Sequence, residues 1–126
     1  MQTLTIEEFY LLCKQQADSP LDTVVICPAC KTMQSGRDFI DAGVEHDSMR
    51  KVLGFNCVGR YTGAHSARKV PDGKPCNWTL GGLLQIHTLE VVDAEGVKRP
   101  HFELASVGAA KYHRDHRAAL MKKVAP

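Results

Sequence analysis

The stretch that decides the fold is VVICPACKT, residues 24–32. Its first three residues are β-branched and predict a short strand, which leads into the turn Cys27-Pro28-Ala29-Cys30. A CPxC turn can hold half of a zinc site, it can exchange electrons as a dithiol, or it can be two neighbouring thiols with no shared role. The rest of the chain has to decide among these three chemistries.

The composition is that of an ordinary soluble globule. The chain has 126 residues, 44% of them apolar and 24% charged, so we expect one domain over residues 1–126. No apolar run approaches the roughly 18 residues needed to cross a bilayer, and the acidic start MQTLTIEEFY does not resemble a secretory signal. We therefore expect a cytoplasmic protein without a membrane partner. In that compartment the five cysteines are better explained as metal ligands or free thiols than as disulfides.

Four of the five cysteines form a candidate metal set. A structural zinc takes four ligands in a tetrahedron, and the CPxC turn supplies Cys27 and Cys30. Cys57 and Cys76 each lie where a predicted strand meets a loop, and together they complete the set. Zinc binding is worth on the order of 10 kcal/mol in small metal-dependent folds, about the whole stability of a domain. The sequence therefore predicts a structural Zn²⁺ held by these four thiolates. Cys13 falls on the apolar face of a predicted helix and is expected to be a buried side chain.

Two alternatives to this metal site stay open. His46 or His65 lies near the right segments and can replace one cysteine as a ligand, whereas the pair His113 and His116 is expected to be exposed on a basic helix. A redox role for Cys27 and Cys30 is the other alternative, because a strand, a CPxC turn and then a helix is the order around a thioredoxin active site.

The periodicity predicts an α+β fold: a small antiparallel sheet with a zinc-ribbon-like knuckle and a helix at each end. Thr5 and Glu8 form a capping box that begins the N-terminal helix, which lies within residues 1–20. Pro100 indicates that its strand is at a sheet edge or carries a bulge. We expect helices over 5–17, 37–42, 49–53 and 106–124, and strands over 23–26, 55–61, 83–92 and 97–105. We also expect a turn over 93–96 and an irregular loop over 62–77. The C-terminal helix lies within a basic segment over 106–126.

Four segments carry a resemblance to a known family: CPACKTMQSGRDFIDAG, GFNCVGRYTGA, KPCNWTLGGLLQIHTLEV and HFELA, within residues 24–105. Together they resemble a family of small bacteriophage and prophage proteins without an assigned activity. The resemblance implies a phage setting and a zinc-ribbon-like core, with Cys27, Cys30, Cys57 and Cys76 as the shared cysteines. Lys31 departs from the usual pattern, because CPxC turns usually continue with a glycine at positive φ. We expect Lys31 to bear some strain there or to use a different turn.

The sequence leaves three classes of function: a binding module, an enzyme and a nucleic-acid-binding protein. The first is a binding module that occupies a host or viral macromolecule, for instance to inhibit a host defence or regulatory complex. It is favoured because the chain has no Ser/His/Asp order, no phosphate-binding glycine loop and no HExxH motif, and because four thiolates leave zinc no open position. An enzyme, either the redox protein or a zinc hydrolase using His65 or His87, is the least favoured class, so we expect no catalytic residues.

The third class is a nucleic-acid-binding protein. Residues 1–56 hold five basic and eight acidic side chains, whereas residues 57–126 hold eleven basic and six acidic ones. The basic half contains cations that could neutralise phosphates and rings that could stack on bases, although we favour core packing beside Cys76 for Trp78. The candidate residues are Arg60, Tyr61, Arg68, Lys69, Lys74 and Trp78 around the proposed zinc loop, and Lys111, Arg114 and Arg117 on the last helix, which also carries Lys122 and Lys123.

Overall fold

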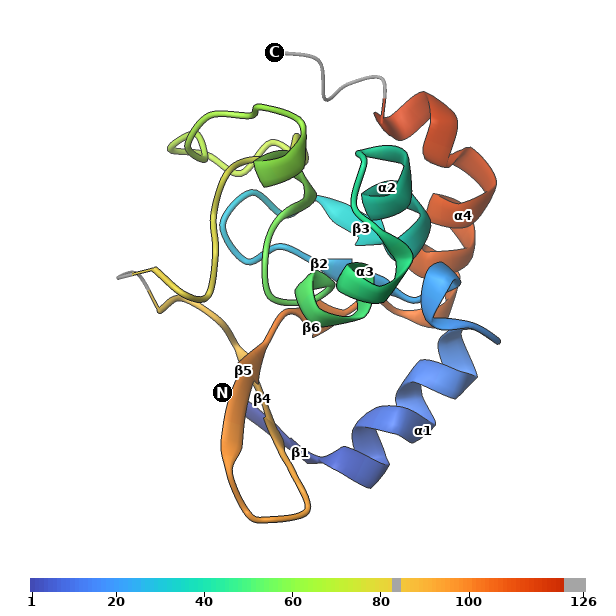
Figure 1. Cartoon of the computed structure of the whole chain (residues 1–126), viewed down its shortest axis with the longest axis vertical. Coiled ribbons are helices and arrows are strands. Elements are labelled where there is room, and N and C mark those ends of the chain that lie inside the picture. The colour runs from blue at the N-terminus through green and yellow to red at the C-terminus, as the bar shows by residue number, and fades with distance from the viewer. Residues whose placement is uncertain (83–84, 122–126) are drawn as a thin grey trace.

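The computed structural model describes residues 1–82 and 85–121 and has an α+β architecture (Figure 1). Within these residues the helices are α1 (Ile6–Gln16), α2 (Gly36–Asp41), α3 (His46–Val52) and α4 (Val107–Met121), with two 3₁₀ turns, η1 (Pro20–Asp22) and η2 (Val58–Tyr61). The strands are β1 (Gln2–Thr5), β2 (Val24–Ile26), β3 (Met33–Ser35), β4 (Leu89–Val92), β5 (Lys98–His101) and β6 (Glu103–Leu104). The predicted fold class, with a helix near each end of the chain, is confirmed.

The strands form two sheets of three strands each among the described residues. One sheet has the order β3-β2-β6 and is antiparallel, and it leads directly into the CPxC turn. The other has the order β1-β4-β5 and is mixed, because β1 runs parallel to β4 from the pair Gln2–Leu89 to the pair Thr5–Val92. In Figure 1 the mixed sheet and α1 make up the lower part, whereas α2, α3 and α4 surround the antiparallel sheet above.

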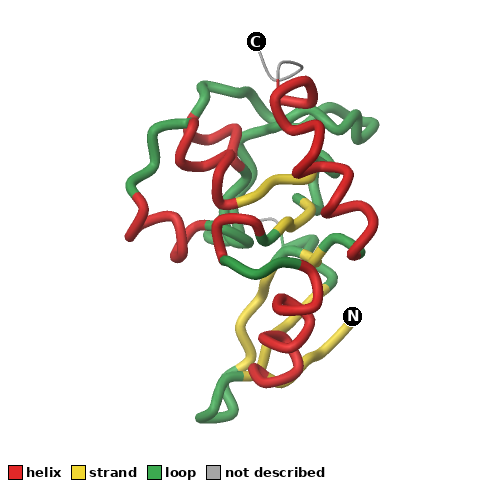
Figure 2. The backbone as a smooth tube through the Cα atoms, turned by 90° about the vertical axis from the view of Figure 1, so that its right-hand side faces the viewer, coloured by secondary structure: helices red, strands yellow, loops and turns green. Residues whose placement is uncertain are grey.

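Helix α1 directly follows β1 and lies beside the mixed sheet (Figure 2), and its last residue, Gln16, is hydrogen-bonded to the antiparallel sheet. The predicted capping box is present: Thr5 N donates to Glu8 Oε1 at 2.9 Å, and Glu8 N donates to Thr5 Oγ1 at 3.2 Å. The buried Gln16 side chain donates to the carbonyl oxygens of Val24 and Ala105 at 2.8 and 2.9 Å. It also accepts from Val24 N at 2.7 Å. One amide group therefore binds α1 to β2 and to the start of the α4 segment.

The apolar core lies around the cysteines and between the helices. Val25, Leu80 and Phe102 are buried together with the four cysteines of the candidate metal set. A second cluster of Phe39, Met49 and Val58 packs α2, α3 and η2 together. The core thus keeps the four candidate metal ligands away from solvent. Among the residues that the structure describes, no helix is both long and apolar enough to cross a membrane.

The predicted strand over 55–61 is wrong. Only one isolated bridge forms there, between Asn56 and Thr79, and the chain then turns into η2. The physical reason is the turn around Cys57: Arg60 N donates to Cys57 O at 3.1 Å, which closes a tight 3₁₀ turn that an extended strand cannot make. Residues Val58 to Tyr61, which the predicted strand included, form this turn instead.

Other predicted elements have different bounds in the structure. Of the strand predicted over 83–92, the structure shows β4 over Leu89–Val92; residues 83 and 84 lie outside the described residues. The strand predicted over 97–105 is divided at the buried Phe102, whose N–H donates to Gly54 O at 2.9 Å, so β5 and β6 join different sheets. The helix predicted over 49–53 is α3 and begins at His46. The end of the C-terminal helix, with Lys122 and Lys123, lies outside the described residues.

The hairpin between β4 and β5 agrees with the sequence. Gly96 N donates to Asp93 O at 3.0 Å and closes the predicted turn. Pro100 lies in β5, which is an edge strand of the mixed sheet, as its missing N–H requires. Gly54 has a φ of 84°, and a Cβ there would lie 2.3 Å from the His101 ring, so glycine is needed where the α3 segment passes β5.

Candidate metal centre

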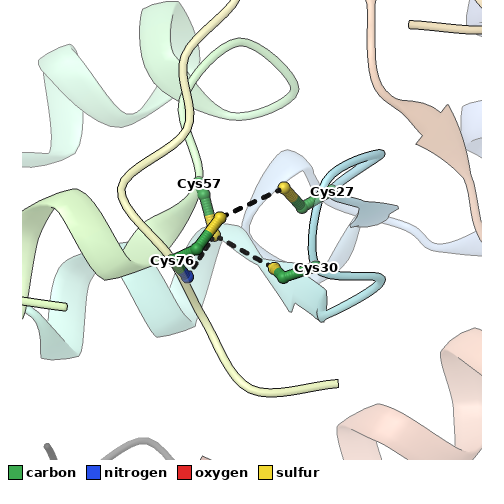
Figure 3. A group of neighbouring side chains, drawn as sticks. All are labelled: Cys27, Cys30, Cys57 and Cys76. Atoms are coloured by element: carbon green, nitrogen blue, oxygen red, sulfur yellow. Dashed lines mark hydrogen bonds between the residues drawn. The ribbon is translucent and has the colours of Figure 1, made fainter. Parts of the chain in front are cut away.

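The side chains of Cys27, Cys30, Cys57 and Cys76 converge on one point (Figure 3). Their four Sγ atoms all lie within 4.8 Å of one another, and all four residues are fully buried. Two of these separations are 3.7 Å between Cys30 Sγ and Cys57 Sγ and 3.9 Å between Cys27 Sγ and Cys76 Sγ. These distances fit the edges of a tetrahedron of sulfur ligands around an ion bonded at about 2.3 Å. The cluster predicted from the sequence can therefore hold a metal ion.

The CPxC turn has the hydrogen bonds of a compact knuckle. Lys31 N donates to Cys27 O at 2.8 Å, and Cys27 N donates to Thr32 O at 3.0 Å, which connects the two ends of the turn between β2 and β3. Lys31 has a φ of 63°, and no other non-glycine residue that the structure describes has a positive φ. The strain expected at Lys31 is therefore present, since a side chain disfavours this backbone conformation.

The opposite half of the cluster comes from two segments held side by side. Cys57 N donates to Trp78 O at 3.0 Å, and Trp78 N donates to Cys76 Sγ at 3.4 Å. Gly59 lies directly against the Cys76 backbone, where a Cβ would be 2.3 Å from the Cys76 carbonyl oxygen. The absence of a side chain at Gly59 therefore permits the approach that brings Cys57 and Cys76 together.

Hydrogen bonds to sulfur complete the surroundings of the cluster. Cys76 N donates to Cys57 Sγ at 3.4 Å. The buried Gln34 side chain donates through Nε2 to the same sulfur at 3.4 Å and accepts from Val58 N at 2.7 Å. Gln34 was not predicted from the sequence. The only local sign of its role is that a polar residue stands four positions after Cys30, in the strand β3 that follows the turn. It orients Cys57 and the start of η2 at once.

The thiols influence one another strongly. Hydrogen bonding with Cys30 raises the pKa of Cys27, and the same interaction lowers the pKa of Cys30. Four thiolates so close in a buried space repel one another, and a cation offsets that repulsion. Thiolates favour a soft ion with tetrahedral coordination, and a fourfold set leaves no open position for a substrate. The arrangement thus suits a structural ion.

The other candidate ligands lie apart from the cluster. His46 and His65 are exposed, and neither belongs to the group of converging ligand atoms. Cys13 is half-buried on α1 rather than fully buried, and burial raises the pKa of its thiol to about 11. Cys13 therefore remains a protonated thiol at neutral pH.

The geometry around the turn differs from that of a dithiol active site. The CPxC turn leads into β3, so no helix begins at the cysteines to stabilise a thiolate, and α2 starts only at Gly36. Cys27 and Cys30 are both fully buried, which keeps a substrate disulfide away from either sulfur.

The two arginines of the predicted nucleic-acid loop hold the loop together. Arg68 makes two hydrogen bonds of 2.8 Å with the Asp72 carboxylate and a third, also of 2.8 Å, with the Lys74 carbonyl oxygen. Arg60 donates to the Asn77 carbonyl oxygen at 2.7 Å. Both guanidinium groups therefore have partners within the protein.

The two rings of this surface are packed as well. The ring centroids of Trp78 and Phe102 are 5.6 Å apart, and Trp78 packs against the buried residues around the four cysteines. This agrees with the core packing expected for Trp78 from the sequence. Tyr61 packs edge-on against Phe39 at 5.8 Å, and its hydroxyl accepts from Asn56 at 2.9 Å. Stacking on a base would compete with these contacts.

The basic side chains of α4 have different kinds of partner. Lys111 pairs with Asp115 at 2.7 Å on the exposed side, and Arg114 donates to the Asp22 carbonyl oxygen at 3.4 Å. In the loop, Lys69 is exposed. The loop over 62–77 and α4 lie on different sides of α2 (Figure 1), and most of the candidate cations are hydrogen-bonded within the protein.

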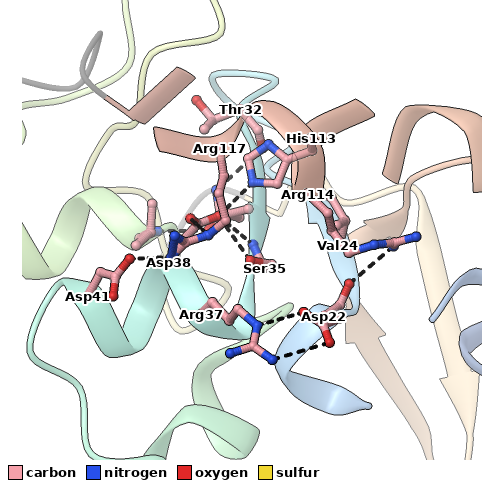
Figure 4. Close-up of polar contacts among 12 residues, drawn as sticks. Asp22, Val24, Thr32, Ser35, Arg37, Asp38, Asp41, His113, Arg114 and Arg117 are labelled. Atoms are coloured by element: carbon pink, nitrogen blue, oxygen red, sulfur yellow. Dashed lines mark hydrogen bonds and ion pairs between the residues drawn. The ribbon is translucent and has the colours of Figure 1, made fainter. Parts of the chain in front are cut away.

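A buried polar network joins α2 to α4 (Figure 4). Asp38 Oδ2 lies 2.6 Å from His113 Nε2 and accepts from Ser35 N and Oγ at 2.9 and 3.1 Å. Arg117 Nε lies 3.2 Å from Asp38 Oδ1, and Arg117 also pairs with Asp41. Both Asp38 and His113 are buried, so α4 is attached to the fold through ions and hydrogen bonds rather than through apolar packing alone.

The expectation that His113 and His116 are both exposed is wrong for the first of them. His113 faces Asp38 in the interior, whereas His116 is exposed and stacks on Tyr112 at 4.3 Å. The HxxH spacing put both imidazoles toward one side of a helix, but only a partner on α2, which is far away in the sequence, determines which one is buried.

The model of the VVA0879-like family matches residues 5–105. The chain belongs to the VVA0879-like family. The matched segment includes all four cysteines of the cluster and α1, and it ends before α4, so the metal centre lies inside the family domain. No curated protein and no solved structure matches the chain.

Proposed function

We propose that this VVA0879-like protein is a zinc-stabilised binding module. The single observation that carries the proposal is the convergence of four fully buried cysteine sulfurs within 4.8 Å of one another. Four thiolates complete the coordination of zinc, so the ion stabilises the fold and no substrate reaches it. The protein then acts through its surface.

The partner in this proposal is a host or viral macromolecule in a bacterial cytoplasm. The support is the sequence resemblance to small bacteriophage and prophage proteins. Such a small protein without an open metal position acts by occupying a surface, for example that of a host defence or regulatory complex, rather than by turning over a substrate.

The metal content tests the first half of the proposal. We expect about one zinc per chain by elemental analysis of the protein purified without added metal. Thiol counting should show four protected cysteines that become reactive when a chelator removes the ion. Cys57→Ser should lose the zinc, whereas Cys13→Ser is the matched control and should retain it. A protein without metal but with a reducible Cys27–Cys30 disulfide would overturn the proposal in favour of the redox alternative.

The mode of action needs a second experiment. Metal-loaded protein with an affinity tag should retain a stoichiometric protein partner from a lysate of the bacterial host. Anisotropy with a labelled oligonucleotide tests the alternative, since phosphate binding weakens steeply between low and moderate salt. If the oligonucleotide binds with this salt dependence and Lys69→Glu with Lys74→Glu abolishes the binding, the partner is a nucleic acid and the protein-binding proposal fails.

A further inference from the structure

The outer face of α1 carries large apolar side chains that the rest of the described chain leaves uncovered. Tyr10 is 59% exposed and Leu11 is 58% exposed, although both are in the middle of the helix. The opposite side of α1, with Phe9 and Gln16, packs toward the sheets. Apolar side chains grouped on the surface mark contacts with other molecules more often than isolated ones do.

Charges border this apolar face in a fixed order. Glu7, Tyr10, Leu11 and Lys14 follow the spacing i, i+3, i+4 and i+7, which places them on one stripe of the helix. The stripe is negative at its start, apolar in its middle and positive at its end. Glu7 and Lys14 are both exposed, and neither forms an ion pair with another described residue.

We propose that this stripe, residues 7, 10, 11 and 14, binds the same stripe of a second copy of the chain. The two α1 helices would run antiparallel, with a twofold axis between Tyr10 and Leu11. Glu7 of each copy then faces Lys14 of the other, and the apolar side chains meet in the centre. A parallel arrangement would place like charges together, so the charge order itself selects the antiparallel pair.

The stripe fits a second copy because it is complementary to itself. A twofold interface requires one patch that can face its own image, and a negative–apolar–positive order fulfils this only in the antiparallel sense. A pair of such short helices buries less surface than the roughly 1,200 Å² of a standard stable interface. We therefore expect a dimer that dissociates on dilution.

Sedimentation velocity of the zinc-loaded full chain, from low micromolar to near-millimolar concentration, tests the dimer. We expect reversible association of the wild type. Glu7→Lys and Lys14→Glu should each weaken it by about tenfold or more, because each replaces two attractive pairs by two repulsive ones. The double charge reversal should restore it. Lys51→Glu, an exposed charge change on α3, is the control and should leave association unchanged.

The double variant separates pairing from helix stability. A glutamate near the start and a lysine near the end stabilise a helix, so exchanging them makes α1 weaker, not stronger. Restored association in that variant therefore has to come from contacts between copies. Leu11→Asp should also give a monomer with unchanged circular dichroism. A wild type that stays monomeric over the whole range, or a dimer that persists in Leu11→Asp, would overturn the proposal.

Discussion

Gly59 illustrates how one missing side chain shapes the metal centre. In Gly59→Ala the new Cβ would lie 2.3 Å from the Cys76 carbonyl oxygen, so Cys57 and Cys76 have to move apart. We expect metal affinity to fall by about tenfold or more and the free energy of unfolding to fall by about 1–3 kcal/mol. Competition with a chromophoric chelator and thermal denaturation measure the two effects. The control is Gly108→Ala, where a Cβ meets nothing within 4 Å, and equal effects in both variants would contradict this explanation.

Gln34 permits a finer test of the hydrogen bonds to sulfur. Gln34→Glu keeps an oxygen acceptor for Val58 N but replaces the amide that donates to Cys57 Sγ. Residues that orient metal ligands typically contribute 10–100-fold to metal affinity, and we expect a loss of about that size. Gln15→Glu on the exposed side of α1 is the matched control. If both variants bind zinc like the wild type, Gln34 only supports the backbone.

At the scale of elements, the attachment of α4 to α2 depends on buried charge. Asp38→Ala removes the group that faces His113, Arg117 and Ser35 and leaves their polar atoms buried without it. We expect the free energy of unfolding to fall by about 3 kcal/mol in denaturant titrations. Asp115→Ala breaks an exposed pair with Lys111 on the same helix and should cost about 0.5 kcal/mol. Similar losses in the two variants would contradict a special role for the network.

The contact between β5 and α1 predicts a pH dependence. The ring centroids of His101 and Phe9 are 4.7 Å apart. Burial lowers the pKa of His101 below its ordinary value of 6.5. The folded protein therefore holds His101 neutral, while the unfolded chain takes up a proton as the pH falls below 6.5. We expect the free energy of unfolding to decrease as the pH falls through this range, and to decrease less in His101→Gln. Since thiol protonation affects both proteins, the difference between them isolates His101.

The sequence predicted the elements that local chemistry determines. The capping box at Thr5 and the turn at Gly96 depend on neighbouring residues and were predicted correctly. The positive φ of Lys31 is one of the two outcomes that the turn allowed. The four clustered cysteines were found because few residue types bind a soft metal. What the sequence did not predict depends on distant partners: β1 beside β4, and His113 against Asp38. A tetrapeptide strand or a lone histidine carries no local signal of the segment that it meets.

For the whole molecule, the metal centre joins three stretches of chain that are far apart in the sequence. If zinc is bound there, its removal by a chelator should abolish most of the cooperative thermal transition. The reason is that a structural site contributes on the order of 10 kcal/mol, about as much as a domain's entire stability. Circular dichroism with and without chelator measures this, and added zinc should restore the transition. An unchanged melting curve after verified loss of metal would show that the core alone holds the fold.

The segment between Cys57 and Cys76 is anchored at both ends by the cysteine cluster. Within it, Gly73 N donates a hydrogen bond to Cys30 O at 3.0 Å. Its outer residues from 65 to 70 are mostly exposed. Because the ends are fixed, even doubling the length of such a loop costs only about 0.6 kcal/mol in closure entropy. This is consequently the place where the architecture can accept inserted residues, such as a peptide epitope or a fluorescent label site, without altering the ligands that hold it.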